Sequence, residues 1–150
     1  MSLENLVKTH QIKPHATHPD EVQRLLVAAT RNLADARVEG ISDETRFDAA
    51  YKAIMQCALV GLMANGYRPS TSVPGHHQTV IQTLSLTLGI PRESWIVMDA
   101  LRKKRNVNDY SGDLIEPESV RECIAQADAL LKHAGQWLSA NQPELLIDAK

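Results

Sequence analysis

The segment between Phe47 and Leu62 limits the fold of this chain more than any other. Apolar side chains cover nearly every face that a helix would have here: Phe47, Ala50, Tyr51, Ile54, Met55, Cys57, Ala58, Leu59, Val60 and Leu62. A helix that is apolar almost all round lies inside a protein, because each of its faces needs a packing partner. The sequence therefore predicts a central helix that other helices enclose, with Tyr51 in the core.

The other long segments also repeat their apolar residues at the period of a helix, and none alternates like a strand. We expect helices within residues 3–10, 19–36, 43–65, 76–88, 92–111 and 117–140, a loop at 67–75, and a loosely held tail at 141–150. Thr17 and Ser42 suit N-terminal caps, and Gly66 suits the left-handed residue that follows a helix. The helix after Pro91 is expected to end at residues 111–113.

The length of 150 residues suits a single domain, with its core at about residues 19–140. Aromatic residues make up only 4% of the chain, which argues against a β-sandwich and fits helices rich in Ala and Leu. The predicted fold class is all-α: an antiparallel four-helix up-and-down bundle with an additional short helix.

The net charge of −2 excludes a protein that binds polyanions over its whole surface, so any nucleic-acid contact must come from a local basic patch. Cys57 and Cys123 stand alone, and the six histidines lack metal-ligand spacing, so we expect neither a metal nor a cofactor. No secretion signal is visible at the N-terminus, and the apolar run at 57–64 is too short to span a bilayer. We expect a cytoplasmic protein with no membrane partner.

The basic stretch at residues 101–110 is the candidate site. On a helix, Arg102, Arg105, Asn106 and Asp109 share one face. Guanidinium groups bind phosphate through two N–H donors, and Asn or Asp side chains can orient them, so this face predicts an anion site. The alternative is an ordinary solvated face, since cations are favoured near a helix C-terminus.

Two motifs resemble the HEPN superfamily, a group of nucleotide-binding helical domains. Residues 48–58, with the Asn65-Gly66-Tyr67-Arg68-Pro69 segment and His76 after them, are similar to one pattern of its prokaryotic members. The stretch from Arg105 to Tyr110 resembles an Arg-x-x-x-Asp-Tyr variant of the family signature. The resemblance covers about residues 19–140.

The resemblance implies a dimeric helical bundle that acts on nucleic acid, often as a ribonuclease or toxin paired with a nucleotidyltransferase-type partner. Ribonuclease members carry Arg followed four to six residues later by His. Here Asn108 follows Arg102 at that distance, while Asp109 and Tyr110 follow Arg105. Two hypotheses stay open: a divergent endoribonuclease or toxin, and a non-catalytic dimer that binds nucleotide, RNA or a partner protein.

RNA cleavage by the 2′-hydroxyl needs a proton acceptor and a cation for the developing charge on phosphorus. For the enzyme we assign catalysis to Arg105, Asp109 and Tyr110, and binding to Arg102, Asn106, Asn108 and His76. His76 and His77 could replace the missing histidine if the fold brings them close. We also expect a homodimer, because the last helix has a heptad face from Val120 to Leu138 and the central helix is apolar on many sides.

Overall fold

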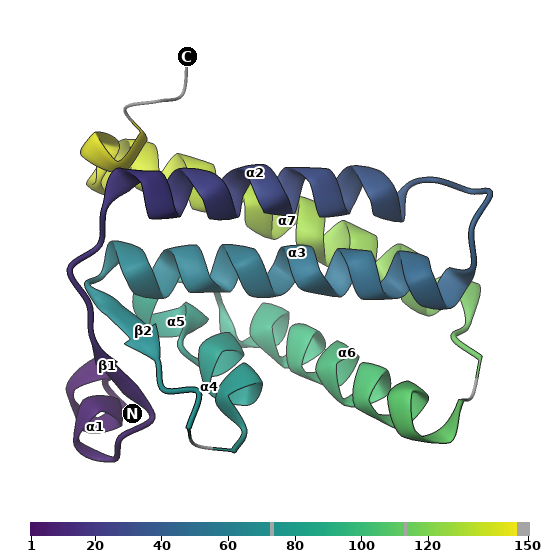
Figure 1. Cartoon of the computed structure of the whole chain (residues 1–150), viewed down its shortest axis with the longest axis horizontal. Coiled ribbons are helices and arrows are strands. Elements are labelled where there is room, and N and C mark those ends of the chain that lie inside the picture. The colour runs from purple at the N-terminus through teal and green to yellow at the C-terminus, as the bar shows by residue number, and fades with distance from the viewer. Residues whose placement is uncertain (73, 113, 147–150) are drawn as a thin grey trace.

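The computed structural model describes residues 1–72, 74–112 and 114–146. In chain order its elements are α1 (Leu3–Lys8), β1 (Ile12–Pro14), α2 (Pro19–Ala36), α3 (Asp43–Ala64), β2 (Tyr67–Pro69), α4 (His76–Gln82), α5 (Leu84–Thr87), α6 (Arg92–Ser111), α7 (Pro117–Asn141) and the 3₁₀ helix η1 (Pro143–Leu146). The predicted all-α class is confirmed, with a two-stranded sheet of three residues per strand beside the helices (Figure 1).

The central position predicted for residues 47–62 is confirmed. Helix α3 packs mainly against α2 and α7, and also touches α4, α5, α6 and β2. Phe47, Tyr51, Ile54 and Leu62 are fully or almost fully buried. Helix α3 is long and apolar enough to cross a membrane, but 67% of its most apolar stretch is buried inside the protein, as in the core helix of a soluble protein.

The four long helices alternate in direction: α2 and α6 run one way, and α3 and α7 run the other (Figure 1). They do not contribute equally to the packing. Helix α3 occupies the centre, and α6 lies obliquely below it in the view, packing against α4 as well as α3 and α7. This position of α6 brings its polar face next to the start of α4.

The observed caps confirm some boundaries and correct one. Ser42 caps α3, its Oγ accepting the Thr45 N–H at 3.1 Å. Thr17 does not cap α2 as predicted. The cap is His18, whose Nδ1 accepts the Asp20 N–H at 3.2 Å. The Thr17 hydroxyl is committed elsewhere, because it donates to the Met63 carbonyl at 2.6 Å.

Left-handed glycines close two helices. Gly66 follows α3 with φ of +87°, as predicted. Gly112 caps α6 with φ of +72° and donates its N–H to the Asn108 carbonyl at 2.9 Å. The predicted end of this helix at 111–113 is thus confirmed for Ser111 and Gly112, while Asp113 lies outside the described residues.

The segment from residue 67 to 88 differs from the prediction in two ways. The predicted continuous helix at 76–88 is wrong, because the helix is interrupted at Thr83 between α4 and α5. The Thr83 Oγ1 donates to the Val80 carbonyl there at 2.7 Å. The loop at 67–75 is wrong at its start, because β2 pairs antiparallel with β1 through Ile12↔Pro69 and Pro14↔Tyr67. Strands of three residues are too short for an alternating pattern to be visible in the sequence.

The predicted loose tail is wrong for residues 143–146. These residues form η1, whose Leu145 is buried against Val22, Val60 and Leu138. A second small core therefore ties the end of the described chain to α2, α3 and α7. Residues 147–150 of the predicted tail lie outside the described residues.

Helix α5 approaches α3 closely at Gly61. A Cβ at this position would lie 2.8 Å from Thr87 Oγ1 and 2.9 Å from Leu88 Cγ, so no larger residue fits without a shift.

Candidate functional site: a pocket between α4 and α6

The start of α4 and the middle of α6 line a pocket of about 280 Å³. Its lining includes His76, His77, Arg102, Arg105 and Asn106. We call it the His–Arg pocket. The two arginines and the asparagine come from the predicted basic face. The fold brings the two adjacent histidines next to them, which was the condition for His76 and His77 to replace the missing catalytic histidine. Four further hollows in the described part of the chain have no histidine in their lining.

Arg105 is held in place by residues of α3. Its Nε donates to Asp48 Oδ1 at 2.9 Å, and its guanidinium carbon lies 5.2 Å from the centroid of the Tyr51 ring. Asp109 is a weaker partner, with Oδ2 at 3.9 Å from Nη2. Burial alone would lower the pKa of Arg105, but the hydrogen bond and charge of Asp48 outweigh it and raise the pKa. Arg105 is therefore a fixed cation.

Arg102 is held in a similar way from its own helix. Its Nε donates to Asp99 Oδ1 at 2.8 Å, and both side chains are only 13% exposed. Lys103 reaches the same carboxylate at 3.7 Å from the solvent side. Lys104 turns toward α7, where its Nζ contacts Glu116 Oε2 at 2.9 Å. Of the four cations at residues 102–105, only the two arginines therefore line the pocket.

The two histidines have different surroundings. His77 Nδ1 lies 3.2 Å from the Tyr51 hydroxyl, and the His76 ring meets the His77 ring edge-on at 4.8 Å between centroids. Burial lowers the pKa of His77, and the positive charges of His76, Arg105 and Arg102 lower it further. His77 is consequently neutral at pH 7, which is the state that can accept a proton.

Tyr51 is a hydrogen-bond partner rather than a base. Its ring is buried, as predicted for a core residue. Burial raises the pKa of its hydroxyl to about 12, although Arg105 and Arg102 pull in the opposite direction. The hydroxyl thus keeps its proton and can fix the orientation of the His77 ring.

Three of the predicted site residues do not line the pocket. Asn108 lines a different hollow, with Lys104 and Leu114. Tyr110 is 93% exposed, and Asp109 is exposed beside Arg105. Successive helix positions are about 100° apart, so positions after Asn106 turn away from α4 or extend past its end.

Two contributors were missed as site residues from the sequence. Asp48 and Tyr51 lie three positions apart on α3 and both reach Arg105. A carboxylate within an otherwise apolar segment was the available signal for Asp48. Tyr51 gave no separate signal, because an aromatic residue at core spacing is ordinary.

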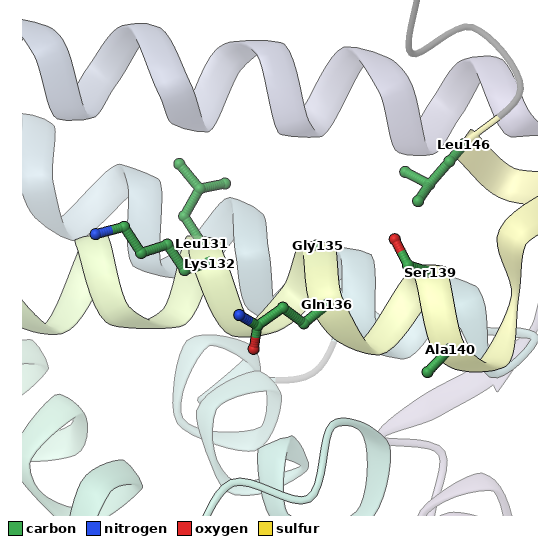
Figure 2. Close-up of a pocket in the computed structure, with 7 residues that line it drawn as sticks. All are labelled: Leu131, Lys132, Gly135, Gln136, Ser139, Ala140 and Leu146. Carbon is green, nitrogen blue, oxygen red and sulfur yellow. The ribbon is translucent and has the colours of Figure 1, made fainter.

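A larger hollow beside α7 offers fewer reactive side chains. A hollow of about 690 Å³ runs along α7 to Leu146, and Figure 2 shows Leu131 and Ser139 directed toward the space below α2. Its single charged residue, Lys132, is paired with Asp128 at 2.9 Å. No catalytic set of side chains meets there.

The described residues contain neither a metal-binding group nor a reactive thiol. Within residues 1–72, 74–112 and 114–146, no group of three or more His, Cys, Asp or Glu side chains could hold a metal ion. Cys57 and Cys123 are buried, and burial raises the pKa of each thiol to about 12. Neither thiol is poised to act as a nucleophile.

The chain matches no protein-family model and no curated protein. The geometry of the His–Arg pocket is therefore the basis for a functional proposal.

Proposed function

We propose that this protein acts on RNA at the His–Arg pocket, as a divergent, metal-independent endoribonuclease of the HEPN type. The observation that carries the proposal is the meeting of Arg102, Arg105 and Asn106 from α6 with His76 and His77 from α4. This set combines fixed cations with imidazole rings that can accept and donate protons, which RNA cleavage requires.

The arginines would bind the phosphate that is attacked. Each uses Nε for a carboxylate, Arg105 for Asp48 and Arg102 for Asp99. The terminal N–H groups can donate to phosphate oxygens, although Arg105 Nη2 also lies 3.9 Å from Asp109 Oδ2. The pairing at Nε limits the movement of each guanidinium. Asn106 adds an amide donor on the same face.

The histidines would move the protons. Neutral His77 would accept the proton of the RNA 2′-hydroxyl at Nε2, in the tautomer whose Nδ1–H donates to the Tyr51 oxygen across the 3.2 Å contact. The 2′-oxygen then attacks phosphorus, the bond to the 5′-oxygen breaks, and His76 in its protonated form supplies the proton to that leaving oxygen. The products are a cyclic phosphate and a free 5′-hydroxyl.

The alternative is a module that binds RNA or nucleotide without cleaving it. The carboxylates of Asp48 and Asp99 favour this alternative, because they already neutralise part of the charge of both arginines. Binding and cleavage must therefore be measured separately on the same variants.

The test uses a fluorescent single-stranded RNA with EDTA present. We expect cleavage by the wild type, loss of cleavage with retained binding in His77→Ala, and weaker binding in Arg105→Ala. Loss of a charge-assisted contact corresponds to about tenfold or more in affinity. Arg105→Lys should restore only part of the affinity, because the planar fork of donors is lost.

The control is Lys103→Ala, since Lys103 is 68% exposed and does not line the pocket. If the wild type binds the RNA without cleaving it, the alternative of a non-catalytic binding module is favoured. If Arg105→Ala lowers only the melting temperature and leaves affinity unchanged, Arg105 serves to hold Asp48 and α3, and the pocket is not the RNA site.

The proposal also covers the partners and location of the protein. We propose that it forms a homodimer, binds a nucleotidyltransferase-type partner protein and is located in the cytoplasm. The heptad face of α7 does not supply the dimer contact, because Val120, Ala127 and Leu138 are buried within the protomer. The apolar faces of α3 are likewise covered. A dimer would have to use exposed apolar side chains such as Val107, Tyr110 and Leu114 at the end of α6.

A further inference from the structure

A separate groove of about 430 Å³ runs between α2, α3 and β2. Apolar side chains dominate its lining: Leu25, Ala28, Leu59, Met63 and Pro69. Arg24, Arg68 and Glu21 complete the lining. We call this site the α2–β2 groove. It shares no lining residue with the His–Arg pocket.

The free charge at this groove is positive. The Glu21 carboxylate is already committed, with Oε1 accepting the His18 N–H at 2.8 Å and Oε2 lying 2.8 Å from His15 Nε2. Over the described ranges, neither Arg24 nor Arg68 has a carboxylate within ion-pair distance. Two guanidiniums and the Glu21 carboxylate thus border an apolar groove, and the charge of Arg24 helps to lower the pKa of Glu21 from beyond ion-pair distance. The lining side chains keep a positive net charge.

The pairing of the two strands places a further cation beside Arg68. Lys13 of β1 lies directly opposite Arg68 of β2. Residues directly opposite in an antiparallel pair point to the same face, and like charges there destabilise the pairing. An anion bound beside Arg68 would remove this repulsion, whereas a purely structural sheet would gain from an acidic residue at either position.

The walls of the groove are tied together by hydrogen bonds. The Thr17 hydroxyl donates to the Met63 carbonyl at 2.6 Å, and the His15 N–H donates to the Gly66 carbonyl at 2.8 Å. These bonds fix the segment before α2 against the end of α3. The groove is therefore formed before any ligand arrives, which lowers the entropic cost of binding.

We propose that the α2–β2 groove binds a small amphipathic anion, with a carboxylate at Arg24 and Arg68 and an aliphatic chain along Leu25, Leu59 and Met63. Residues 21–28 of α2 span about 10 Å at 1.5 Å per residue, which matches a medium-length chain. The volume lies in the range of about 300–1,000 Å³ that small-molecule pockets occupy. A stable protein partner needs about 800 Å² on each side, more than eight lining residues provide.

The test is calorimetric titration of the whole protein with decanoate, below the concentration at which it forms micelles. We expect saturable binding of one decanoate per protein. Arg24→Gln and Arg68→Gln should each weaken it by about tenfold or more, because each removes a charge-assisted contact. Decanol, which has the chain without the charge, should bind far more weakly than decanoate.

The matched control is Arg121→Gln, which removes an exposed arginine from α7 that does not line the groove. It should bind decanoate like the wild type. Arg68→Gln should also keep or raise the melting temperature, because it removes the repulsion from Lys13. Absence of saturable binding, equal weakening by Arg121→Gln, or equal affinity for decanol would each overturn the proposal. RNA cleavage should be unchanged in Arg24→Gln and Arg68→Gln, so the two proposals can fail independently.

Discussion

At the scale of single residues, the Thr87 hydroxyl stands out. Within the described residues it is the one buried side-chain polar atom without a hydrogen-bond partner, and it faces Gly61 across the α3–α5 contact. Thr87→Val removes the unpaired hydroxyl and keeps the branched shape. We expect a gain of about 1 kcal/mol in the free energy of unfolding, which raises the melting temperature by about 2–4 °C in a protein of this size.

Thr83→Val is the matched control for this prediction. Thr83 is equally buried, but its hydroxyl donates to the Val80 carbonyl at 2.7 Å. Loss of that bond should lower the free energy of unfolding by about 1 kcal/mol. Two substitutions of the same chemistry should therefore shift calorimetric melting in opposite directions. A decrease in both variants would mean that Thr87 also has a partner in solution.

His77 gives a prediction for pH. Its pKa is lowered in the folded protein, first by burial and then by its cationic neighbours, whereas an unfolded histidine titrates near about 6.5. The unfolded chain therefore binds the proton more readily, so stability present above about pH 6.5 is lost as pH falls. Urea unfolding at pH 7 and pH 5 should show a smaller loss in His77→Gln than in the wild type. Equal losses would contradict the assigned surroundings of His77.

At the scale of elements, α3 carries much of the stability. Ile54 is fully buried at the middle of this helix. Ile54→Ala should lower the free energy of unfolding by roughly 2–5 kcal/mol, as deletion of large core side chains does. Lys52→Ala, an exposed position on the same helix, is the control and should stay close to the wild type. Chemical denaturation of both variants gives the comparison.

What could be predicted from the sequence differs between elements for physical reasons. Helix α3 was predictable, because burial on most sides leaves a nearly all-round apolar pattern that can be recognised without knowing which elements pack against it. The break at Thr83 was not, since Val80 and Leu84 keep helical spacing across it. The cap of α2 was misplaced by one residue, because Thr17 is a common cap but is drawn to the Met63 carbonyl by tertiary packing.

The candidate site shows the same division. The face of Arg102, Arg105 and Asn106 follows from helix geometry alone, and all three line the His–Arg pocket. The contribution of His77 depended on how α4 packs against α6, which no local pattern encodes. Asp48 and Tyr51 belong to the site only because α6 packs against α3, so their contact with Arg105 could not be predicted without the fold.

At the scale of the whole molecule, the proposed homodimer can be tested by light scattering at tens of micromolar. We expect twice the mass of the 16.6 kDa chain. Leu114→Ser should weaken the dimer, because the Leu114 side chain is 82% exposed and apolar, whereas Leu86→Ser on α5 is the control at another exposed apolar position. A protomer mass for the wild type at this concentration would rule out the dimer.

The central position of α3 also determines which parts of the protein can unfold locally and which unfold only with the whole. Since α2, α7, α4, α5 and α6 all lie against it, its backbone amides can reach solvent only when several elements separate together. Hydrogen–deuterium exchange of the amides in α3 should therefore report the free energy of global unfolding. The short α1 and the β1–β2 ladder have few neighbours and should exchange through local opening. Denaturant should accelerate exchange strongly in α3 and hardly at all in β1. Exchange rates in α3 would then report how each substitution described above changes the free energy of global unfolding.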